Sequence, residues 1–198
     1  MISEELIETY GGRRLELLKG QVLFKIDTLP RFYYQIISGT IKMNNFNEDG
    51  KEFIQGLFGK KDSFGEPPLF ENMAYPAYAQ AVENSVVWQL GKADFLRLLK
   101  EHPESHLSIT KVLAKRLHYK ATMAAEISSE NAEHRLLKLI DYLKVYVHKI
   151  ASHEKYQVGL SRQQMADLTG LRVETVIRAI KSLEKKHEIT LESHKVIR

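Results

Sequence analysis

The chain has 198 residues, of which 43% are hydrophobic and 27% charged, a balance typical of a folded globular protein and not of a disordered one. It contains no cysteine, which excludes disulfides, thiol nucleophiles and metal sites held by cysteine. No stretch approaches the roughly 20 apolar residues of a membrane-spanning helix. The first residues, MISEELIETYGG, carry acids where a secretory signal would be basic. We therefore expect a cytoplasmic protein without a membrane partner.

Charge is distributed unevenly along the chain. Residues 135–198 contain 13 Lys and Arg but only 7 Asp and Glu, whereas residues 1–134 contain 16 and 18. The net charge of +4 at pH 7 therefore originates in the last third of the chain. A basic segment of this kind favours a polyanionic partner such as nucleic acid. The alternative at this point is surface charge without a specific partner.

The region from residue 20 to residue 90 has the pattern of short strands separated by turns. Glu48-Asp49-Gly50 predicts a hairpin turn, and residues 78–90 predict a strand pair that turns near Glu83-Asn84. Short strands without long helices between them predict a small antiparallel barrel or sandwich. The other expected strands are rich in β-branched and aromatic residues, and they lie at 21–26, 32–39, 40–46 and 51–58.

The pattern becomes helical after residue 92. Residues 93–102 predict a short amphipathic helix that Pro103 ends, and a long helix is expected at about 106–130. Apolar residues recur on one face of this long helix at intervals of three and four. Such a stripe is best buried against an identical helix, which predicts a homodimer; the alternative is that the helix covers the β-barrel. The residues of the stripe are Ile109, Leu113, Leu117, Ala121, Ala124 and Ile127.

The segment 160–189, LSRQQMADLTGLRVETVIRAIKSLEKKHEI, is the most informative part of the sequence. Ser161 followed by Gln164 forms a capping box that begins a helix at 162–169, and Gly170 ends it in a tight turn. A second helix is expected at about 173–186. Two helices joined by such a turn predict a DNA-binding helix-turn-helix. An amphipathic helix over 133–150 precedes it, with inward residues Leu136, Leu137, Ile140, Leu143 and Val147.

The outer face of the second helix carries groups that can contact DNA bases. Glu174 and Arg178 are four residues apart and project to the same side. A carboxylate can accept from cytosine while a guanidinium donates to guanine, and the two side chains could also brace each other. Thr175 and Lys181 share this face. The alternative is an ordinary surface ion pair.

The last five residues, HKVIR, form a short basic segment after the second helix. They predict one strand of a β-wing, with Lys195 and Arg198 near DNA phosphates.

With these motifs, the sequence resembles the Crp/Fnr superfamily of transcription regulators over residues 13–198. The resemblance implies an α+β fold, with an antiparallel, jelly-roll-like β-barrel of the cyclic-nucleotide-binding type over residues 1–105. It further implies a dimerisation helix over 106–132 and a winged helix-turn-helix over 133–198. It also implies a homodimer that binds a palindromic operator in double-stranded DNA, with RNA polymerase as a further partner.

The resemblance assigns individual residues to DNA. Val173 stands where the Fnr branch also has Val and the cyclic-AMP receptor branch has Arg, which implies half-sites with a TTGA-type core. Ile177 departs from the Fnr branch, where a Ser contacts a base. The expected DNA-binding residues are Ser161, Arg162, Gln163, Arg172, Val173, Glu174, Thr175, Arg178 and Lys181.

The sensory domain resembles the family in outline. FYYQIISGTIKM is similar to its strand–Gly–strand signature, and DSFGEPPLFEN is similar to its phosphate-binding cassette, with Gly65 and Glu66 retained. Pro76 and Ala77 stand where cyclic-nucleotide binders place the Arg and Ser that hold the cyclic phosphate. The resemblance therefore implies a regulator that cyclic AMP does not control, with Gly65 and Glu66 as turn residues.

The sequence does not identify an effector. The candidate effector-binding residues are Gly65, Glu66, Tyr78 and Lys120, and Tyr75 and Trp88 are further aromatic candidates. An alternative is a barrel that serves only dimerisation and partner docking.

A cupin-like metal enzyme on a similar barrel is the rival from another class. Such enzymes need His and carboxylate ligands within the barrel, but the first His is His102, after the strands end. We therefore predict no catalytic residues, no bound metal and no cofactor.

Overall fold

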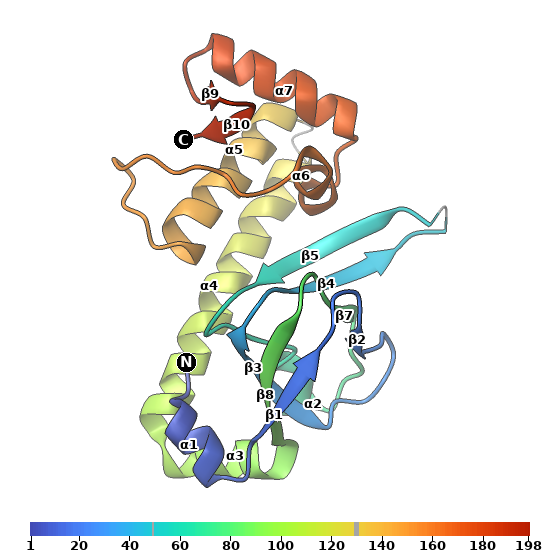
Figure 1. Cartoon of the computed structure of the whole chain (residues 1–198), viewed down its shortest axis with the longest axis vertical. Helices are drawn as coiled ribbons and strands as arrows, with labels where there is room; N and C mark the ends of the chain where they lie inside the picture. The colour runs from blue at the N-terminus through green and yellow to red at the C-terminus, as the bar shows by residue number, and fades with distance from the viewer. Residues whose placement is uncertain (49, 129–130) are drawn as a thin grey trace. The chain divides into compact units, whose positions relative to one another are not determined.

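In a computed structural model, the chain forms two compact units, residues 1–115 and 116–198, whose elements are labelled in Figure 1. The structure describes residues 1–48, 50–128 and 131–198, without the side chains of residues 126–128. The predicted hairpin turn at Glu48-Asp49-Gly50 thus includes one residue, Asp49, outside the described part. The side chain of Ile127 also lies outside it.

Two four-stranded antiparallel sheets form most of the N-terminal unit, as the predicted jelly-roll-like fold requires. Strands distant in sequence are neighbours in both sheets, which is typical of a jelly roll. The first sheet has the order β1 (Arg13–Leu17), β8 (Ser85–Gly91), β3 (Phe32–Ser38) and β6 (Ser63–Phe64). The second has the order β2 (Val22–Phe24), β7 (Tyr78–Ala81), β4 (Ile41–Phe46) and β5 (Glu52–Phe58). Every predicted strand is present, with ends shifted by one or two residues.

Strand β3 is buried on both faces and separates two hydrophobic cores. Because successive side chains of a strand point to opposite faces, Tyr34 and Ile36 enter a core shared with β2, β4 and β7. Tyr33 enters the other core, where its ring stacks on that of Phe95 with centroids 4.5 Å apart. This second core lies beneath the helices α1 (Glu4–Thr9) and α3 (Lys92–Glu101).

Pro103 both ends one helix and begins the next. Helix α3 ends at Glu101, as the proline predicts, and helix α4 then spans Pro103–Ser128. Proline is well placed at the first position of a helix, where its missing N–H has no intrahelical acceptor. The long helix therefore begins three residues earlier than the predicted 106–130. The short helices α1 and α2 (Pro67–Glu71) were not predicted.

The apolar stripe predicted on α4 is divided between two environments. Ile109 is buried in the second core of the N-terminal unit, and Leu113 is partly buried against it. Leu117 is 70% exposed, and Ala121 and Ala124 are also exposed. Towards the start of the helix, the exposed apolar positions lie on a different face from the one predicted. The exposed apolar residues are Leu107, Ala114, Leu117, Ala121 and Ala124, and the exposed Thr110, whose hydroxyl donates to the His106 carbonyl, lies in the same series.

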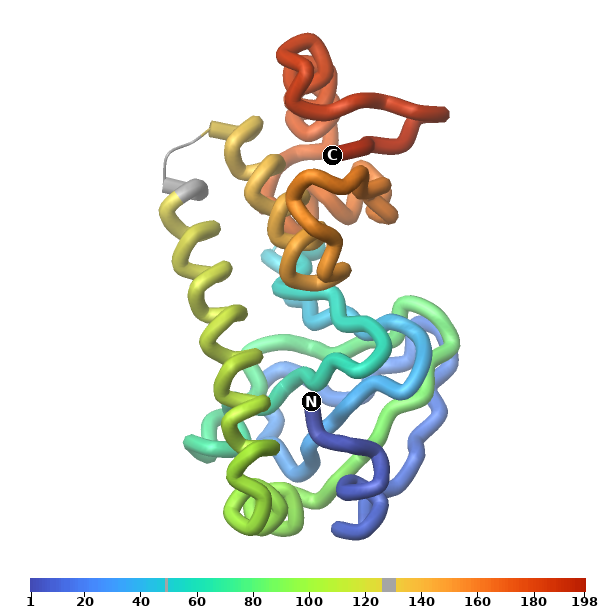
Figure 2. The backbone as a smooth tube through the Cα atoms, turned by 90° about the vertical axis from the view of Figure 1, so that its left-hand side faces the viewer, coloured from blue at the N-terminus to red at the C-terminus, as the bar shows by residue number. Residues whose placement is uncertain are grey.

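In its described residues, the C-terminal unit contains three further α-helices and a two-stranded sheet. Helix α5 (Ala132–Tyr142) passes into a π-helix, η1 (Leu143–Val147), so the helix predicted over 133–150 is shorter and not regular throughout. Helices α6 (Arg162–Thr169) and α7 (Val173–Lys185) follow. The strands β9 (Thr190–Glu192) and β10 (Lys195–Ile197) form the terminal hairpin, red in Figure 2. No helix among the described residues has both the length and the apolar character needed to cross a membrane.

Candidate nucleic-acid interface

The turn between α6 and α7 is built by local sequence signals. The Ser161 hydroxyl accepts a hydrogen bond from the Gln164 amide at 3.1 Å, and the Gln164 side chain accepts from the Ser161 amide at 2.9 Å. This reciprocal pair is the predicted capping box. Gly170 ends α6 with φ of 70°, a conformation that costs glycine little because it has no Cβ. The predicted helix over 162–169 is thus confirmed at both ends.

A common hydrophobic core fixes the orientation of α7. The apolar face of α7 is buried together with Met165 and Ala166 of α6, both fully buried. The small Ala166 allows a close approach of the two helices. Helix α5 contributes Leu136, Leu139 and Ile140 to the same core. The residues of α7 in this core are those predicted from the sequence, Val176, Ala179, Ile180 and Leu183.

The opposite face of α7 is exposed and carries the polar residues singled out in the sequence. Glu174, Arg178 and Lys181 are exposed, while Thr175 is half-buried. Val173 is also half-buried and packs against the core of the unit, so only part of its side chain is available to a partner. Among the described residues, Glu174 and Arg178 form no ion pair with each other. The mutual bracing considered for them is therefore absent from this structure.

The arginines of this unit divide into engaged and free groups. Arg135, only 8% exposed, donates to the carbonyl of Thr169 at 3.2 Å and so holds the end of α6. Arg162 donates to the carbonyl of His194 at 3.0 Å, which links α6 to the β9–β10 hairpin. By contrast, Arg172 and Arg178 are exposed and have no hydrogen-bond or ion-pair partner among the described residues. The free guanidiniums thus lie at the start and on the outer face of α7.

Two residues predicted to contact phosphates also take part in bonds within α6. Gln163 is exposed, and its side-chain nitrogen donates to Asp167 at 2.8 Å. The Ser161 hydroxyl caps the helix as described and remains at the exposed surface. Both residues lie at the N-terminal end of α6, where unpaired amides and the helix dipole favour an anion.

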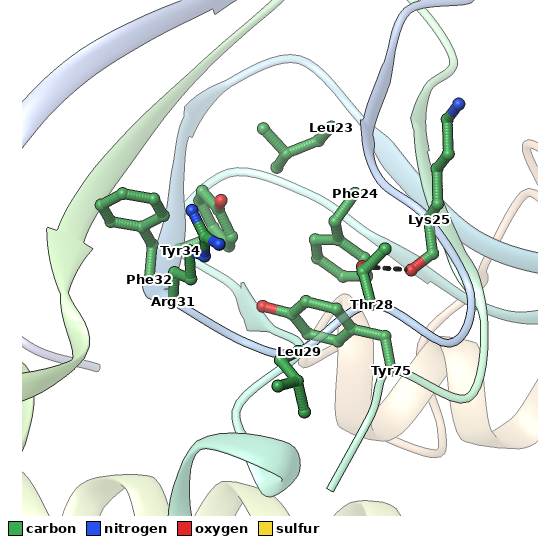
Figure 3. Close-up of a pocket in the computed structure, with 9 residues that line it drawn as sticks. All are labelled: Leu23, Phe24, Lys25, Thr28, Leu29, Arg31, Phe32, Tyr34 and Tyr75. Atoms are coloured by element: carbon green, nitrogen blue, oxygen red, sulfur yellow. Dashed lines mark hydrogen bonds between the residues drawn. The ribbon is translucent and has the colours of Figure 1, made fainter. Parts of the chain in front are cut away.

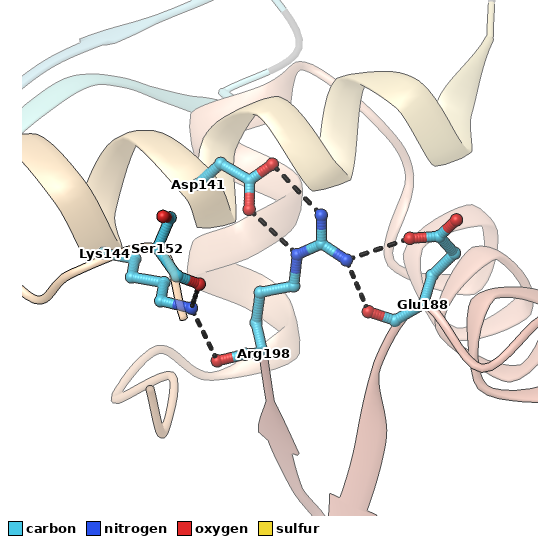
Figure 4. A network of polar contacts seen from close by, with 5 residues as sticks. All are labelled: Asp141, Lys144, Ser152, Glu188 and Arg198. Carbon is cyan, nitrogen blue, oxygen red and sulfur yellow. Dashed lines mark hydrogen bonds and ion pairs between the residues drawn. The ribbon is translucent and has the colours of Figure 1, made fainter. Parts of the chain in front are cut away.

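The β9–β10 hairpin follows α7 and supplies the second strand that a wing requires. Lys195 is exposed on β10, so its contact with phosphates stays a prediction. Arg198 is not. Its guanidinium donates to Asp141 at 2.9 Å and to both the carboxylate and the carbonyl of Glu188, at 2.9 and 2.7 Å (Figure 4). The expectation that Arg198 faces DNA phosphates is therefore wrong, because two carboxylates hold its guanidinium in place. The hydrogen bond to Asp141 is the main cause of the raised pKa of Arg198.

A lysine that the sequence did not single out completes this network. Lys144, 5% exposed, donates to the carbonyls of Ser152 and Arg198 at 2.7 and 3.3 Å. It lies on the π-helix and ties the loop after it to the last strand (Figure 4). The sequence does not single out Lys144 and Arg135, because the carbonyl groups that accept their hydrogen bonds come from other segments of the chain.

The cassette residues of the N-terminal unit have structural roles. Gly65 has φ of +72°, and a Cβ there would lie 3.0 Å from the Phe24 ring and 3.1 Å from that of Tyr75. Glu66 is 1% exposed and accepts a hydrogen bond from the Ser63 hydroxyl. Ala77 is fully buried, and the carbonyl of Pro76 accepts from the Asn45 side chain at 2.9 Å.

The aromatic effector candidates do not share one site. Trp88 belongs to the core beneath α1 and α3, whereas Tyr75 belongs to the core between the sheets. Tyr78 is half-buried on β7, and its ring is 6.3 Å from that of Phe46 at an interplanar angle of 65°. Lys120 lies on α4 in the C-terminal unit and is exposed. No group of three or more His, Asp or Glu among the described residues is placed to hold a metal ion.

Two family profiles match the chain. The profile of the cyclic nucleotide-binding domain matches residues 14–102, and that of the Crp-like helix-turn-helix domain matches residues 134–198. Together these matches include both the paired sheets and the α6–α7 motif.

Similar proteins come from the same group of regulators. The Fumarate and nitrate reduction regulatory protein of Yersinia pestis is 28% identical over 90% of this chain and 72% of its own length. The Anaerobic regulatory protein of Pasteurella multocida is 30% identical over 87% of this chain, which spans 63% of that protein.

Solved structures share the fold at lower sequence identity. The c-di-GMP-responsive global regulator CLP of Xanthomonas campestris has a TM-score of 0.76 at 20% identity, covering 98% of both chains. FixK2 of Bradyrhizobium japonicum has a TM-score of 0.75 at 16% identity, covering 94% of this chain and 91% of FixK2. The two matched profiles, the curated relatives and the shared fold together show that the chain belongs to the Crp/Fnr family of transcription regulators.

Proposed function

We propose that this protein is a homodimeric, sequence-specific DNA-binding regulator that inserts α7 into the major groove. The observation that carries the proposal is the exposed guanidinium of Arg178, which has no partner among the residues that the structure describes, on a helix whose other face is packed in a core. A guanidinium can bind the O6 and N7 atoms of guanine through two hydrogen bonds. Glu174, one turn earlier and also exposed, can accept from the amino group of cytosine. The half-site that we propose retains the TTGA-type core inferred from Val173.

Phosphate contacts would hold α7 in position without reading sequence. We propose that these contacts come from the N-terminal ends of both helices, from Ser161 and Gln163 on α6 and from Arg172 and Thr175 on α7. Lys181 is exposed two turns into α7 and is free of partners among the described residues. For Arg162 we propose a shared role, since one terminal nitrogen donates to the His194 carbonyl at 3.0 Å and the other to the Met165 sulfur at 4.0 Å, so that only part of its donor capacity is left for a phosphate.

The dimer that we propose is formed by α4. Members of the family act as dimers, and the exposed residues 107, 110, 114, 117, 121 and 124 of α4 alternate in steps of three and four. This alternation is the repeat that places one seam of a helix against a parallel partner. Two-fold symmetry would then set two copies of α7 about 34 Å apart, one turn of B-DNA, which matches a palindromic operator.

We also propose that cyclic AMP does not control DNA binding. Burying a cyclic phosphate removes its hydration, a cost that a bidentate cation normally offsets. The residues at the expected phosphate position are Pro76 and the fully buried Ala77, and Glu66 is already bonded to Ser63. RNA polymerase is the further partner that membership of the family suggests.

The test separates base contacts from phosphate contacts by fluorescence anisotropy on short duplexes. Arg178→Ala should weaken binding to the preferred site by about 1–3 kcal/mol and reduce the preference for its guanine. Lys181→Ala should weaken binding to all sequences alike and lower the salt dependence by about one counterion. Lys149→Ala removes another exposed cation from the same unit and serves as the matched control. An Arg178→Ala protein with unchanged sequence preference would contradict the assignment.

A further inference from the structure

A cavity of about 550 Å³ opens in the N-terminal unit beside strands β2 and β3 (Figure 3). Its volume is within the range of about 300–1,000 Å³ that small-molecule sites occupy. The cavity is lined by β2, the turn that connects it to β3, the first residues of β3, and Tyr75. Neither Glu66 nor the Pro76-Ala77 pair lines it, so it is distinct from the segment that resembles a phosphate-binding cassette.

Four of the nine residues that line the cavity are aromatic. The rings of Phe24 and Tyr75 are stacked with centroids 3.7 Å apart, and the Phe24 ring is 5.9 Å from that of Tyr34. Phe32, half-buried, adds a ring 6.3 Å from Tyr34. Fixed aromatic rings of this kind favour a flat, apolar ligand that can stack on a face or contact an edge.

One polar group in these walls lacks a partner. The side chain of Tyr75 is 3% exposed, and its hydroxyl has no hydrogen bond to any described residue. Buried hydroxyls are nearly always hydrogen-bonded in folded proteins, so an unpaired one points to a missing partner. Figure 3 shows this hydroxyl directed towards the side of the cavity where Arg31 and Tyr34 lie.

The charge around the cavity is positive. Arg31 and Lys25 are both exposed and unpaired among the described residues, and no carboxylate lines the cavity. The Arg31 guanidinium lies beside the Phe32 and Tyr34 side chains, whereas the Lys25 ammonium extends away from them (Figure 3). A guanidinium with free nitrogens is suited to bind a carboxylate through two parallel hydrogen bonds.

We propose that this cavity binds a small aromatic carboxylate. The carboxylate would pair with Arg31, the ring would lie against Phe24 and Phe32, and an oxygen of the ligand would accept the hydrogen bond that Tyr75 now lacks. This inference concerns the N-terminal unit alone and does not rest on the proposed DNA binding.

Isothermal titration calorimetry of the full chain with 2-naphthoate tests the proposal. We expect saturable binding at one site per chain. The uncharged isostere 2-naphthamide should bind at least about tenfold more weakly, because it cannot form the charged pair with the guanidinium. The absence of saturable 2-naphthoate binding to the folded protein would overturn the proposal, as would equal affinity for both compounds.

Three variants locate the site. Arg31→Gln should weaken 2-naphthoate binding by about tenfold or more, and Tyr75→Phe should weaken it by roughly fivefold through loss of one hydrogen bond. Arg97→Gln removes another exposed guanidinium of the same unit outside the cavity and should leave the affinity unchanged. Trp88 fluorescence verifies that each variant is folded, since Trp88 is the sole tryptophan and is buried in this unit. Unchanged affinity in a folded Arg31→Gln protein would place any binding elsewhere and overturn the proposal.

Discussion

Two buried tyrosines should respond in opposite ways to the removal of their hydroxyl groups. The free energy of unfolding should fall for Tyr33→Phe and rise for Tyr75→Phe. Tyr33, fully buried, donates a hydrogen bond to Gln35 at 2.8 Å, whereas the buried hydroxyl of Tyr75 has no partner in the described part of the chain. Tyr33→Phe loses a hydrogen bond and leaves part of the Gln35 amide unpaired, which should lower the free energy of unfolding by about 1–2 kcal/mol. Tyr75→Phe removes a dehydrated hydroxyl and keeps the stacked ring, which should raise that free energy by about 1 kcal/mol.

The two variants control for each other because they make the same substitution in the same unit. Urea unfolding followed by Trp88 fluorescence reports this unit, since the chain has one tryptophan and it lies in the same core as Tyr33. The urea midpoints of Tyr33→Phe and Tyr75→Phe should lie below and above the midpoint of the unaltered protein. The dependence of the free energy of unfolding on urea concentration should be the same in all three proteins. If Tyr75→Phe lost as much stability as Tyr33→Phe, the hydroxyl of Tyr75 would have a partner in solution, and the argument from its unpaired state would fail.

Three further perturbations test other parts of the structure. Leu117→Glu places a charge at a 70% exposed position on the proposed α4 seam and should shift the protein towards monomer in sedimentation; an unchanged dimer would move the interface elsewhere. Ser161→Ala removes the cap of α6 and should lower the free energy of unfolding of the C-terminal unit by about 1 kcal/mol. Ser161→Asp can still cap the helix and should preserve this free energy. Unfolding followed by far-UV circular dichroism distinguishes the two variants. The hydrogen bond from Lys186 lowers the pKa of Glu133, so their pairing stabilises the folded state above the ordinary carboxyl pKa and this stabilisation disappears as the pH falls through the lowered value. Urea unfolding at pH 7 and pH 4 should therefore show a smaller acid-induced loss for Glu133→Gln, and an identical loss would contradict the pairing.

The sequence was sufficient to predict those elements whose signals lie within one short segment of the chain. The capping box at Ser161, the positive φ of Gly170 and the spacing of the buried residues of α7 are all properties of one short segment. Consequently, the helix-turn-helix was predicted nearly to the residue. Strands β2 to β5, β7 and β8 were also predicted, because β-branched and aromatic runs between turns do not depend on their eventual neighbours, whereas β1 and β6 were not predicted.

Features that depend on distant residues were not predictable. The direction of Arg198 is set by Asp141, which lies 57 residues earlier, and no local pattern distinguishes this arginine from one that faces DNA. The exposed face of α4 was displaced for a similar reason, since Ile109 is buried in a core formed by the N-terminal unit. Tyr75 and Trp88 were grouped as aromatics, although β3 separates the cores to which they belong.

Selection of binding sites from random duplex DNA by the full chain, without cyclic AMP, tests the central claim most directly. Our account predicts a palindromic consensus of two half-sites with a TTGA-type core, centred about one helical turn apart because two copies of α7 bind in successive major grooves. It also predicts that added cyclic AMP leaves both the consensus and its affinity unchanged. Recovery of no consensus, of a single half-site without symmetry, or of a palindrome only in the presence of cyclic AMP would contradict it.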